Sequence, residues 1–166
     1  MPIIVRHSEA RDIEAIRAIY SQPGNVASTL QLPFPSAELW EQRLARRHEN
    51  FYSLVACSAE RVLGQIGIEV FAAARRKHAA NIGLAVDAQS RRSGVGAALV
   101  GAALELCHGW LAVTRVELET YTDNAAAIGL FEAHGFTVEG RAIDYAFRAG
   151  QYVDVLLMAH CVRIKP

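Results

Sequence analysis

Residues 91–96, Arg91-Arg92-Ser93-Gly94-Val95-Gly96, form the stretch from which the fold of this chain can be worked out. The apolar run 82–86 before it is typical of a buried strand, and the Ala-rich run 97–104 after it favours a helix. A turn between strand and helix directs free backbone N–H groups and the positive end of the helix dipole at whatever lies above it. The glycines allow close approach to the main chain, and the arginines add positive charge. The stretch predicts a phosphate-binding turn, although such glycine pairs also occur where a helix merely packs on a sheet.

The composition bounds the class of protein. A chain of 166 residues predicts a single domain, 1–166, with a sizeable core. Its 17 basic and 17 acidic side chains balance, which argues against a nucleic-acid or membrane-surface partner. Neither a leader-like N-terminus nor an apolar run of the roughly 18 residues needed for a membrane span is evident. Three widely spaced cysteines suit reduced thiols, and the six histidines lack metal-ligand spacing. We expect a cytoplasmic protein without a metal.

The N-terminal part of the chain alternates strand and helix signals. Residues 3–6 predict a strand, and Ser8 can cap a helix that extends to Tyr20. The cluster 21–25 contains a proline and a glycine and predicts a break. Residues 30–35 are apolar but carry two prolines, so this loop is either a packed connection or a pocket wall. Ser36 can cap a second helix.

In the rest of the chain, the spacing of the apolar residues changes from a helical to a strand period. Period-two patterns predict strands at 51–57, 61–71, 81–86, 113–121, 136–147 and 152–162, with the first two and last two paired as hairpins. A helix is expected from Asn124 to a C-cap at Gly135. The predicted class is α/β, with antiparallel hairpins and with helices between strands.

Two separated motifs together identify a family. The first is Arg91-x-x-Gly94-x-Gly96, and the second is Asp123-Asn124-x-x-Ala127-Ile128-x-x-Phe131-x-x-x-Gly135-Phe136. In this order and spacing they resemble the GNAT superfamily of acetyl-CoA-dependent N-acetyltransferases, over essentially the whole chain. The resemblance implies the GNAT acyltransferase fold: a mixed, mostly antiparallel central sheet, splayed at the cofactor slot and flanked by about four helices. It also implies a homodimer.

Three further stretches resemble the bacterial subgroup that acetylates free L-amino acids. They are residues 29–36, Arg148-x-Gly150-x-Tyr152-x-Asp154 and Met158-Ala159. The resemblance implies an enzyme that transfers acetyl from acetyl-CoA to the primary amine of a small molecule, by direct attack in a ternary complex. Protein N-termini, polyamines and antibiotic amines stay open as acceptors. A non-catalytic acetyl-CoA sensor is the alternative from another functional class.

The same resemblance assigns residues to coenzyme A. The pyrophosphate is expected on the main-chain amides of the Arg-rich turn, and the pantetheine arm along the preceding strand, with a local kink at Gly83. The N–H near Leu84 is expected to polarise the thioester carbonyl. The implied cofactor contacts are Leu84, Ala85, Val86, Arg91, Arg92, Ser93, Gly94, Val95, Gly96, Ala97, Asn124, Ala127 and Phe131.

Proton transfer is where the sequence departs from this family. Asn81 stands where many members carry a carboxylate base, and Phe131 where many carry an acidic tyrosine. An alkyl ammonium must lose its proton before it attacks. Glu69 and Glu119 are therefore the candidate bases, acting through water, unless they only form a solvated strand face. Tyr121, Tyr145 and Tyr152 are candidate acids, and an unaided thiolate is also possible.

The acceptor site is the least determined part of the sequence. The substrate contacts are expected at Leu32, Phe34, Tyr145 and Tyr152. An amino acid could place its ammonium at Asp144 or Asp154 and its carboxylate at Arg148 or Arg17, and no spacing selects among these four.

Other enzyme classes lack their signals. A nicotinamide-binding turn would have a third glycine where Leu99 stands, and a P-loop would end in Gly-Lys-Ser/Thr rather than continue with Ala97 and Ala98. The sequence also has no Gly-x-Ser-x-Gly elbow.

Overall fold

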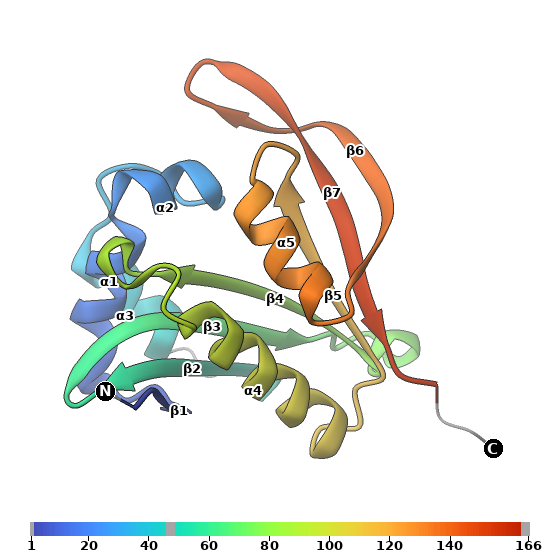
Figure 1. Ribbon diagram of the computed structural model, residues 1–166, viewed down its shortest axis with the longest axis horizontal. Helices are drawn as coiled ribbons and strands as arrows, with labels where there is room; N and C mark the ends of the chain where they lie inside the picture. Colours follow the sequence, from blue (N-terminus) through green and yellow to red (C-terminus); the bar gives the residue numbers. More distant parts are fainter. Residues whose placement is uncertain (1, 46–48, 164–166) are drawn as a thin grey trace.

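The computed structural model describes residues 2–45 and 49–163, and within them one sheet of seven strands carries the fold (Figure 1). The strand order across the sheet is β1-β2-β3-β4-β5-β7-β6. The strands are β1 (Ile4–His7), β2 (Phe51–Ser58), β3 (Arg61–Val70), β4 (Ala79–Val86), β5 (Arg115–Tyr121), β6 (Thr137–Arg148) and β7 (Gln151–Cys161). The α-helices of these residues are α1 (Ile13–Tyr20), α2 (Pro23–Ser28), α3 (Ala37–Ala45), α4 (Val95–Gly109) and α5 (Ala125–Ala133). The mixed, mostly antiparallel sheet confirms the predicted fold class.

The predicted break at 21–25 is confirmed at residues 21–22, between α1 and α2, but the chain is helical again from Pro23. Pro23 is the first residue of α2, where its missing N–H costs no hydrogen bond and its fixed φ suits a helix. The helices described are therefore five rather than about four. The described residues include no helix that is both long and apolar enough to cross a membrane.

Each sheet face packs against its own helices. On β2, Leu54 and Ala56 are buried in the larger core, which takes Val95 and Leu99 from α4. Their neighbours Val55 and Cys57 are buried in a smaller core with Ile16, Ile19 and Tyr20 of α1 and Trp40 of α3. This alternation follows from the two-residue period of a strand. As a result, α4 and α1 lie on opposite faces of the sheet.

The strands β4 and β5 are parallel but pair over only three positions, from Ala79↔Arg115 to Asn81↔Glu117. Beyond Asn81, β4 continues to pair with β3 as far as Val86, and β5 pairs with β7 as far as Tyr121. Each strand stays paired with its antiparallel neighbour, but β4 and β5 no longer pair with each other. The two strands therefore diverge in Figure 1. The predicted splay is confirmed, and it opens immediately before Gly83.

The closing hairpin is irregular at two places, between Val138 and Gly140 and between Ala142 and Ala146, and the second bears on the cavity. Ala142 pairs with Val155 and Ala146 with Val153, so the three residues 143–145 lie opposite Asp154 alone. The backbone N–H of Asp144, a residue at φ 50°, donates to Asp154 Oδ1 over 2.9 Å. Such a bulge bends its strand and redirects a side chain.

Candidate active site

A cavity of about 1140 Å³ lies where β4 and β5 separate, and it reaches both faces of the sheet. On one face it is lined by the start of α4 and by α5, which we call the α4–α5 half; its lining includes Arg92, Gly94, Gly96, Ala97, Asn124, Ala127, Leu130 and Phe131. On the other face lies the α2–α3 half; its lining includes Tyr20, Asn25, Thr29, Gln31, Trp40, Arg43, Glu69, Asn81, Glu119, Tyr121, Tyr145 and Arg148. Two molecules can therefore meet in it from opposite sides of the sheet.

The α4–α5 half presents main chain rather than side chains. Gly94 is the N-cap of α4 with φ 87°, a left-handed conformation that favours glycine. The N–H groups of the first helical turn have no intrahelical acceptor and carry the positive end of the helix dipole. At Gly96, a Cβ atom would lie 3.0 Å from Cδ2 of Leu130, so the glycine lets α4 approach α5 closely. This half suits an anionic group held by amides.

The main chain of β4 also offers hydrogen-bonding groups to the cavity. Asp87 N–H donates to Leu63 O of β3 over 2.8 Å, and the β3–β4 register has no bulge. Since successive N–H groups of a strand point to opposite edges, those of Leu84 and Val86 point away from β3, toward the side that β5 has left. Accordingly, the Val86 carbonyl accepts from Asn25 Nδ2 over 3.0 Å instead of from β3.

Most of the predicted cofactor residues line this cavity. Those that do are Leu84, Ala85, Val86, Arg91, Arg92, Gly94, Gly96, Ala97, Asn124, Ala127 and Phe131. Ser93 and Val95 do not: the Ser93 hydroxyl donates to Ser90 O over 2.5 Å, and Val95 is buried in the core. Asn124 caps α5, its Oδ1 accepting from Ala127 N over 3.2 Å. Only main-chain groups of Ser93 and Val95 remain for a ligand.

Arg91 already has a structural partner. Its Nη2 donates to Asn25 Oδ1 over 2.9 Å, and its guanidinium lies against Gly24, where a Cβ atom would be 3.1 Å from Nη2. Asn25 is buried and donates to Ile19 O as well. The Arg-rich turn is thereby joined to α2, which belongs to the other half of the cavity.

Three polar side chains form a row across β3, β4 and β5 at the mouth of the splay. Glu69 is the cross-strand partner of Asn81, and Asn81 Nδ2 donates to both carboxylate oxygens of Glu119, over 3.2 and 3.3 Å. Both glutamates are exposed to the cavity. An amide between two carboxylates avoids the repulsion that a third carboxylate would add. The row offers two proton acceptors and one donor that orients Glu119.

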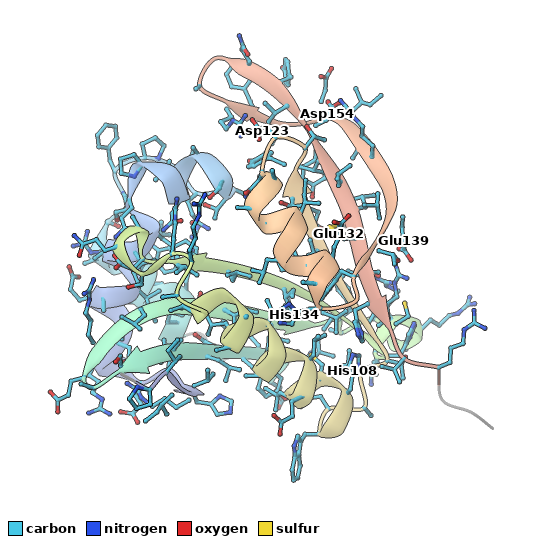
Figure 2. The ribbon with its side chains drawn as sticks, in the orientation of Figure 1. His108, Asp123, Glu132, His134, Glu139 and Asp154 are labelled. Atoms are coloured by element: carbon cyan, nitrogen blue, oxygen red, sulfur yellow. The ribbon has the colours of Figure 1, made fainter. Side chains whose placement is uncertain are left out.

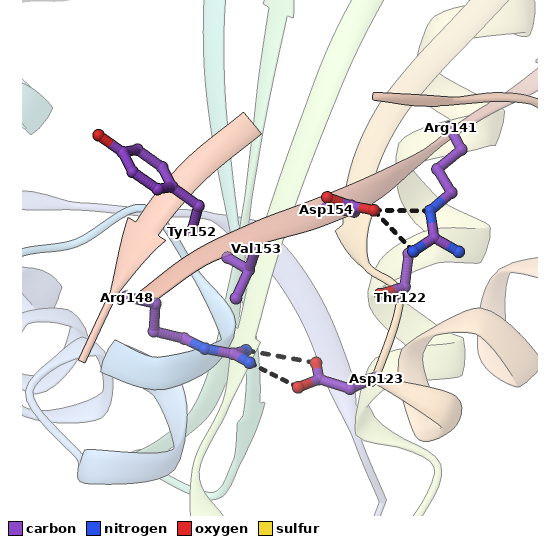
Figure 3. A pocket seen from close by; sticks show the side chains of 7 residues that line it. All are labelled: Thr122, Asp123, Arg141, Arg148, Tyr152, Val153 and Asp154. Atoms are coloured by element: carbon purple, nitrogen blue, oxygen red, sulfur yellow. Dashed lines mark hydrogen bonds and ion pairs between the residues drawn. The ribbon is translucent and has the colours of Figure 1, made fainter. Parts of the chain in front are cut away.

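The tip of the β6–β7 hairpin closes the α2–α3 half. Arg148 Nη2 donates to Asp123 Oδ2 over 2.5 Å (Figure 3), and Nη1 donates to Ala27 O of α2 over 3.2 Å. Its guanidinium also lies 4.8 Å from the ring centre of Tyr121, whose hydroxyl donates to Thr29 O. Hydrogen bonding to Arg148 lowers the pKa of Asp123. Arg148 therefore joins the β6–β7 hairpin to β5 and α2.

The predicted substrate residues separate into two groups. Tyr145, displaced by the β6 bulge, lines the cavity; burial raises its pKa, as do the nearby Glu119 and Tyr121. Leu32 and Phe34 are 81% and 99% exposed and do not line it. Tyr152 lines a separate pocket of about 260 Å³ beside Arg148 (Figure 3).

The loop 30–35 is thus a pocket wall only at its start, through Leu30 and Gln31.

The residues suggested for an acceptor's charges lie elsewhere or are occupied. Asp154 stands at the hairpin end of the molecule (Figure 2), and Asp144 does not line the large cavity. Asp154 accepts from the Asp144 N–H and pairs with Arg141 at 2.6 Å, and it lies outside the large cavity. Arg17 pairs with Glu14 on α1, also outside it.

Several lining residues were missed by sequence reasoning. Tyr20 and Trp40 stack with ring centres 4.7 Å apart, and Tyr20 donates to Gln65 Oε1 over 2.7 Å. Arg43 follows Trp40 by one helical turn and lies 5.2 Å from the centre of its ring. The helical period favours core positions for Tyr20 and Trp40, and both are buried, but nothing local indicates that the same cluster borders a cavity.

The chain is similar to known acetyltransferases in both sequence and structure. Residues 13–136 match the acetyltransferase (GNAT) family. The chain is 44% identical to the L-amino acid N-acetyltransferase AaaT of Escherichia coli (strain K12) over 157 residues, 95% of this chain and 96% of that protein. The ribosomal-protein-alanine N-acetyltransferase from Brucella melitensis superposes with a TM-score of 0.85 at 25% identity, over 96% of this chain and 99% of that one. A phosphinothricin acetyltransferase from Sinorhizobium meliloti, solved in complex with AcCoA, shares the fold with a TM-score of 0.87 at 22% identity, over 98% and 89% of the two chains.

Proposed function

The chain belongs to the acetyltransferase (GNAT) family and is an acetyl-CoA-dependent N-acetyltransferase, and on this premise we propose that its acceptor is the α-amine of a free L-amino acid. The observation that carries the proposal is the 44% identity, along almost the full length of both chains, to an L-amino acid N-acetyltransferase. The predicted resemblance to that subgroup is confirmed as a similarity. A cavity open on both sheet faces supports a ternary complex, with one substrate in each half.

Coenzyme A fits the α4–α5 half. The amides at the start of α4 would hold the pyrophosphate, with Arg92 adding charge, and the strand edge at Leu84 and Val86 would pair with the pantetheine arm. Bound acetyl-CoA supplies an activated acyl carbon. The Leu84 N–H, which points toward the opening, would stabilise the developing oxyanion.

The α2–α3 half would accept the proton of the amine. We assign this step to Glu119, directly or through a water, because Asn81 fixes its carboxylate and both line the cavity. Glu69, which lies in the same row on β3 and on the other side of Asn81, is the second candidate.

For the departing thiolate, Phe131 offers no proton. Tyr145 is the candidate acid, because it lines the cavity and its hydroxyl makes no hydrogen bond within the residues that the structure describes. The hydroxyl of Tyr121, in contrast, donates a hydrogen bond to Thr29 O.

An acceptor screen tests this proposal. Thiol release from acetyl-CoA is followed with purified protein over the free L-amino acids, polyamines, aminoglycosides and a peptide with a free N-terminus. Release that depends on an L-amino acid is the expected result. Preference for an amine of another class would refute the acceptor, and tight acetyl-CoA binding without amine-dependent release would favour the sensor alternative.

We further propose that residues 1–166 work as a single domain in a cytoplasmic homodimer with a small-molecule amine substrate. The hairpin exposes Ile143 and Phe147, at 76% and 65%, and such apolar side chains support an interface with a second subunit there. All three cysteines are free thiols, which supports the cytoplasmic location. Sedimentation of the purified protein at micromolar concentration would distinguish a dimer from a monomer.

A further inference from the structure

The cavity is lined by four arginines, and three of them are already engaged or belong to the other substrate. Arg148 is neutralised by Asp123, and Arg91 is bonded to Asn25. Arg92 stands at the start of α4, in the half that suits phosphate. Arg43 alone of the four projects from α3 into the α2–α3 half.

Arg43 is held in place without being neutralised. Its Nη1 donates to Oε1 of Gln31, a neutral amide, and its guanidinium lies 5.2 Å from the centre of the Trp40 ring. Within residues 2–45 and 49–163, no carboxylate pairs with it. A guanidinium has five N–H donors in a planar fork that matches a carboxylate, so most of its donors remain available to a ligand.

Opposite charges thus line one half of the cavity. Glu69 and Glu119 project from the strands, and Arg43 projects from α3. The same lining includes the aromatic residues Tyr20, Trp40 and Phe51. A free amino acid carries an ammonium and a carboxylate on one carbon, so a cavity that offers both carboxylates and a guanidinium complements it, whereas a simple amine has no group for Arg43.

We propose that Arg43, positioned by Gln31 and Trp40, binds the α-carboxylate of the acceptor and makes the enzyme select amino acids over simple amines. This inference rests on the proposed function. It replaces Arg148 and Arg17 in the carboxylate role, since the first is neutralised and the second lies outside the cavity.

The test uses acceptor pairs that differ only in the carboxylate: L-leucine and 3-methylbutylamine, L-phenylalanine and 2-phenylethylamine, L-methionine and 3-(methylthio)propylamine. Wild type should prefer the amino acid of a pair. Because a hydrogen bond to a charged group contributes about 1.5–3 kcal/mol, Arg43→Ala should lower kcat/KM for that amino acid about ten- to hundredfold, mainly through KM. The same variant should leave kcat/KM for the matching amine unchanged. Arg43→Lys should recover part of the loss, since it restores the charge without the fork.

Arg11→Ala is the control, because Arg11 is an exposed arginine paired with Glu9 and does not line the cavity. An equal loss for amino acid and amine in Arg43→Ala would overturn the carboxylate role and leave the proposed function standing. Full activity of Arg43→Ala toward the amino acid would do the same. Wild-type turnover of amines but of none of the three amino acids would overturn both proposals.

Discussion

The two halves of the cavity are built in different ways. The α4–α5 half is formed by main-chain groups and small residues of two short segments, the β4–α4 turn and the start of α5. The α2–α3 half is held together by side-chain bonds between segments far apart in the chain, such as Arg148 to Asp123 and Arg91 to Asn25. Main-chain groups offer the same hydrogen bonds whatever the side chains are, whereas a half held together by side-chain bonds can change with a few substitutions. Substitutions should therefore have separable effects in the two halves.

The largest effect is expected where the halves meet, at Glu119. Loss of the general base in Glu119→Gln should lower kcat about a hundredfold or more, while the Kd of coenzyme A stays at the wild-type value. Glu69→Gln, measured alongside across pH, identifies which carboxylate accepts the proton. Glu132→Gln is the matched control, since Glu132 lies on the exposed side of α5 and outside the cavity lining (Figure 2). If neither Glu119→Gln nor Glu69→Gln alters the rate, the row on β3, β4 and β5 does not supply the base.

The second-largest effect is expected on the affinity for coenzyme A, from a substitution confined to the α4–α5 half. Gly94→Val places a β-branched residue at φ 87°, and the cost of about 1–2 kcal/mol or more for a left-handed L-residue should weaken coenzyme A binding roughly tenfold. Gly101→Ala is the control, because this glycine lies within α4 with open space around its Cβ position. Calorimetric titration with coenzyme A measures both. Wild-type affinity in Gly94→Val would show that the turn does not hold the phosphates.

The same difference explains how far sequence reasoning reached. The glycine turn, its flanking strand and helix, and the cap at Asn124 are local patterns, and all were predicted correctly. The start of α2 was missed because Pro23 breaks structure everywhere except at the first turn of a helix. Arg91 was assigned to phosphate because its partner Asn25 lies 66 residues away, a distance over which no local pattern operates.

Tyr145 is a similar case. Strict alternation along β6 does not reveal that three residues bulge opposite Asp154 and that one of them reaches the cavity. The helical period favours a solvated position for Arg43, and the residue is exposed, yet it also lines the α2–α3 half of the cavity. Residues whose role depends on a distant segment are the ones that a single sequence leaves open.

A moderate effect on acceptor binding is expected at Arg148, which joins the β6–β7 hairpin to β5 and α2. Arg148→Ala removes two hydrogen-bonded partners and the contact with Tyr121, so the KM of the acceptor should rise about three- to tenfold with unchanged coenzyme A affinity. Arg141→Ala removes the neighbouring pair with Asp154, outside the cavity, and should leave both constants unchanged. Equal effects of the two variants would indicate general loosening of the hairpin instead.

The smallest effect is expected at Asp12, and it concerns the stability of the fold. Asp12 is the N-cap of α1, the helix that carries Tyr20 into the α2–α3 half. Asp12 is buried, and hydrogen bonds from Arg6 of 2.7 and 2.9 Å lower its pKa, helped by the Glu9 N–H. Because the folded-state pKa is depressed, this carboxylate stabilises the protein above the unfolded value of about 3.9 and loses that contribution as pH falls through the folded value. Asp12→Asn should therefore unfold about 1–3 kcal/mol more easily than wild type at pH 7, and the difference should vanish in acid. Denaturant unfolding between pH 7 and 3 measures it, with the exposed Glu14→Gln, which should change little, as control. A difference that persists unchanged to pH 3 would mean that Asp12 stabilises α1 through packing rather than through its charge.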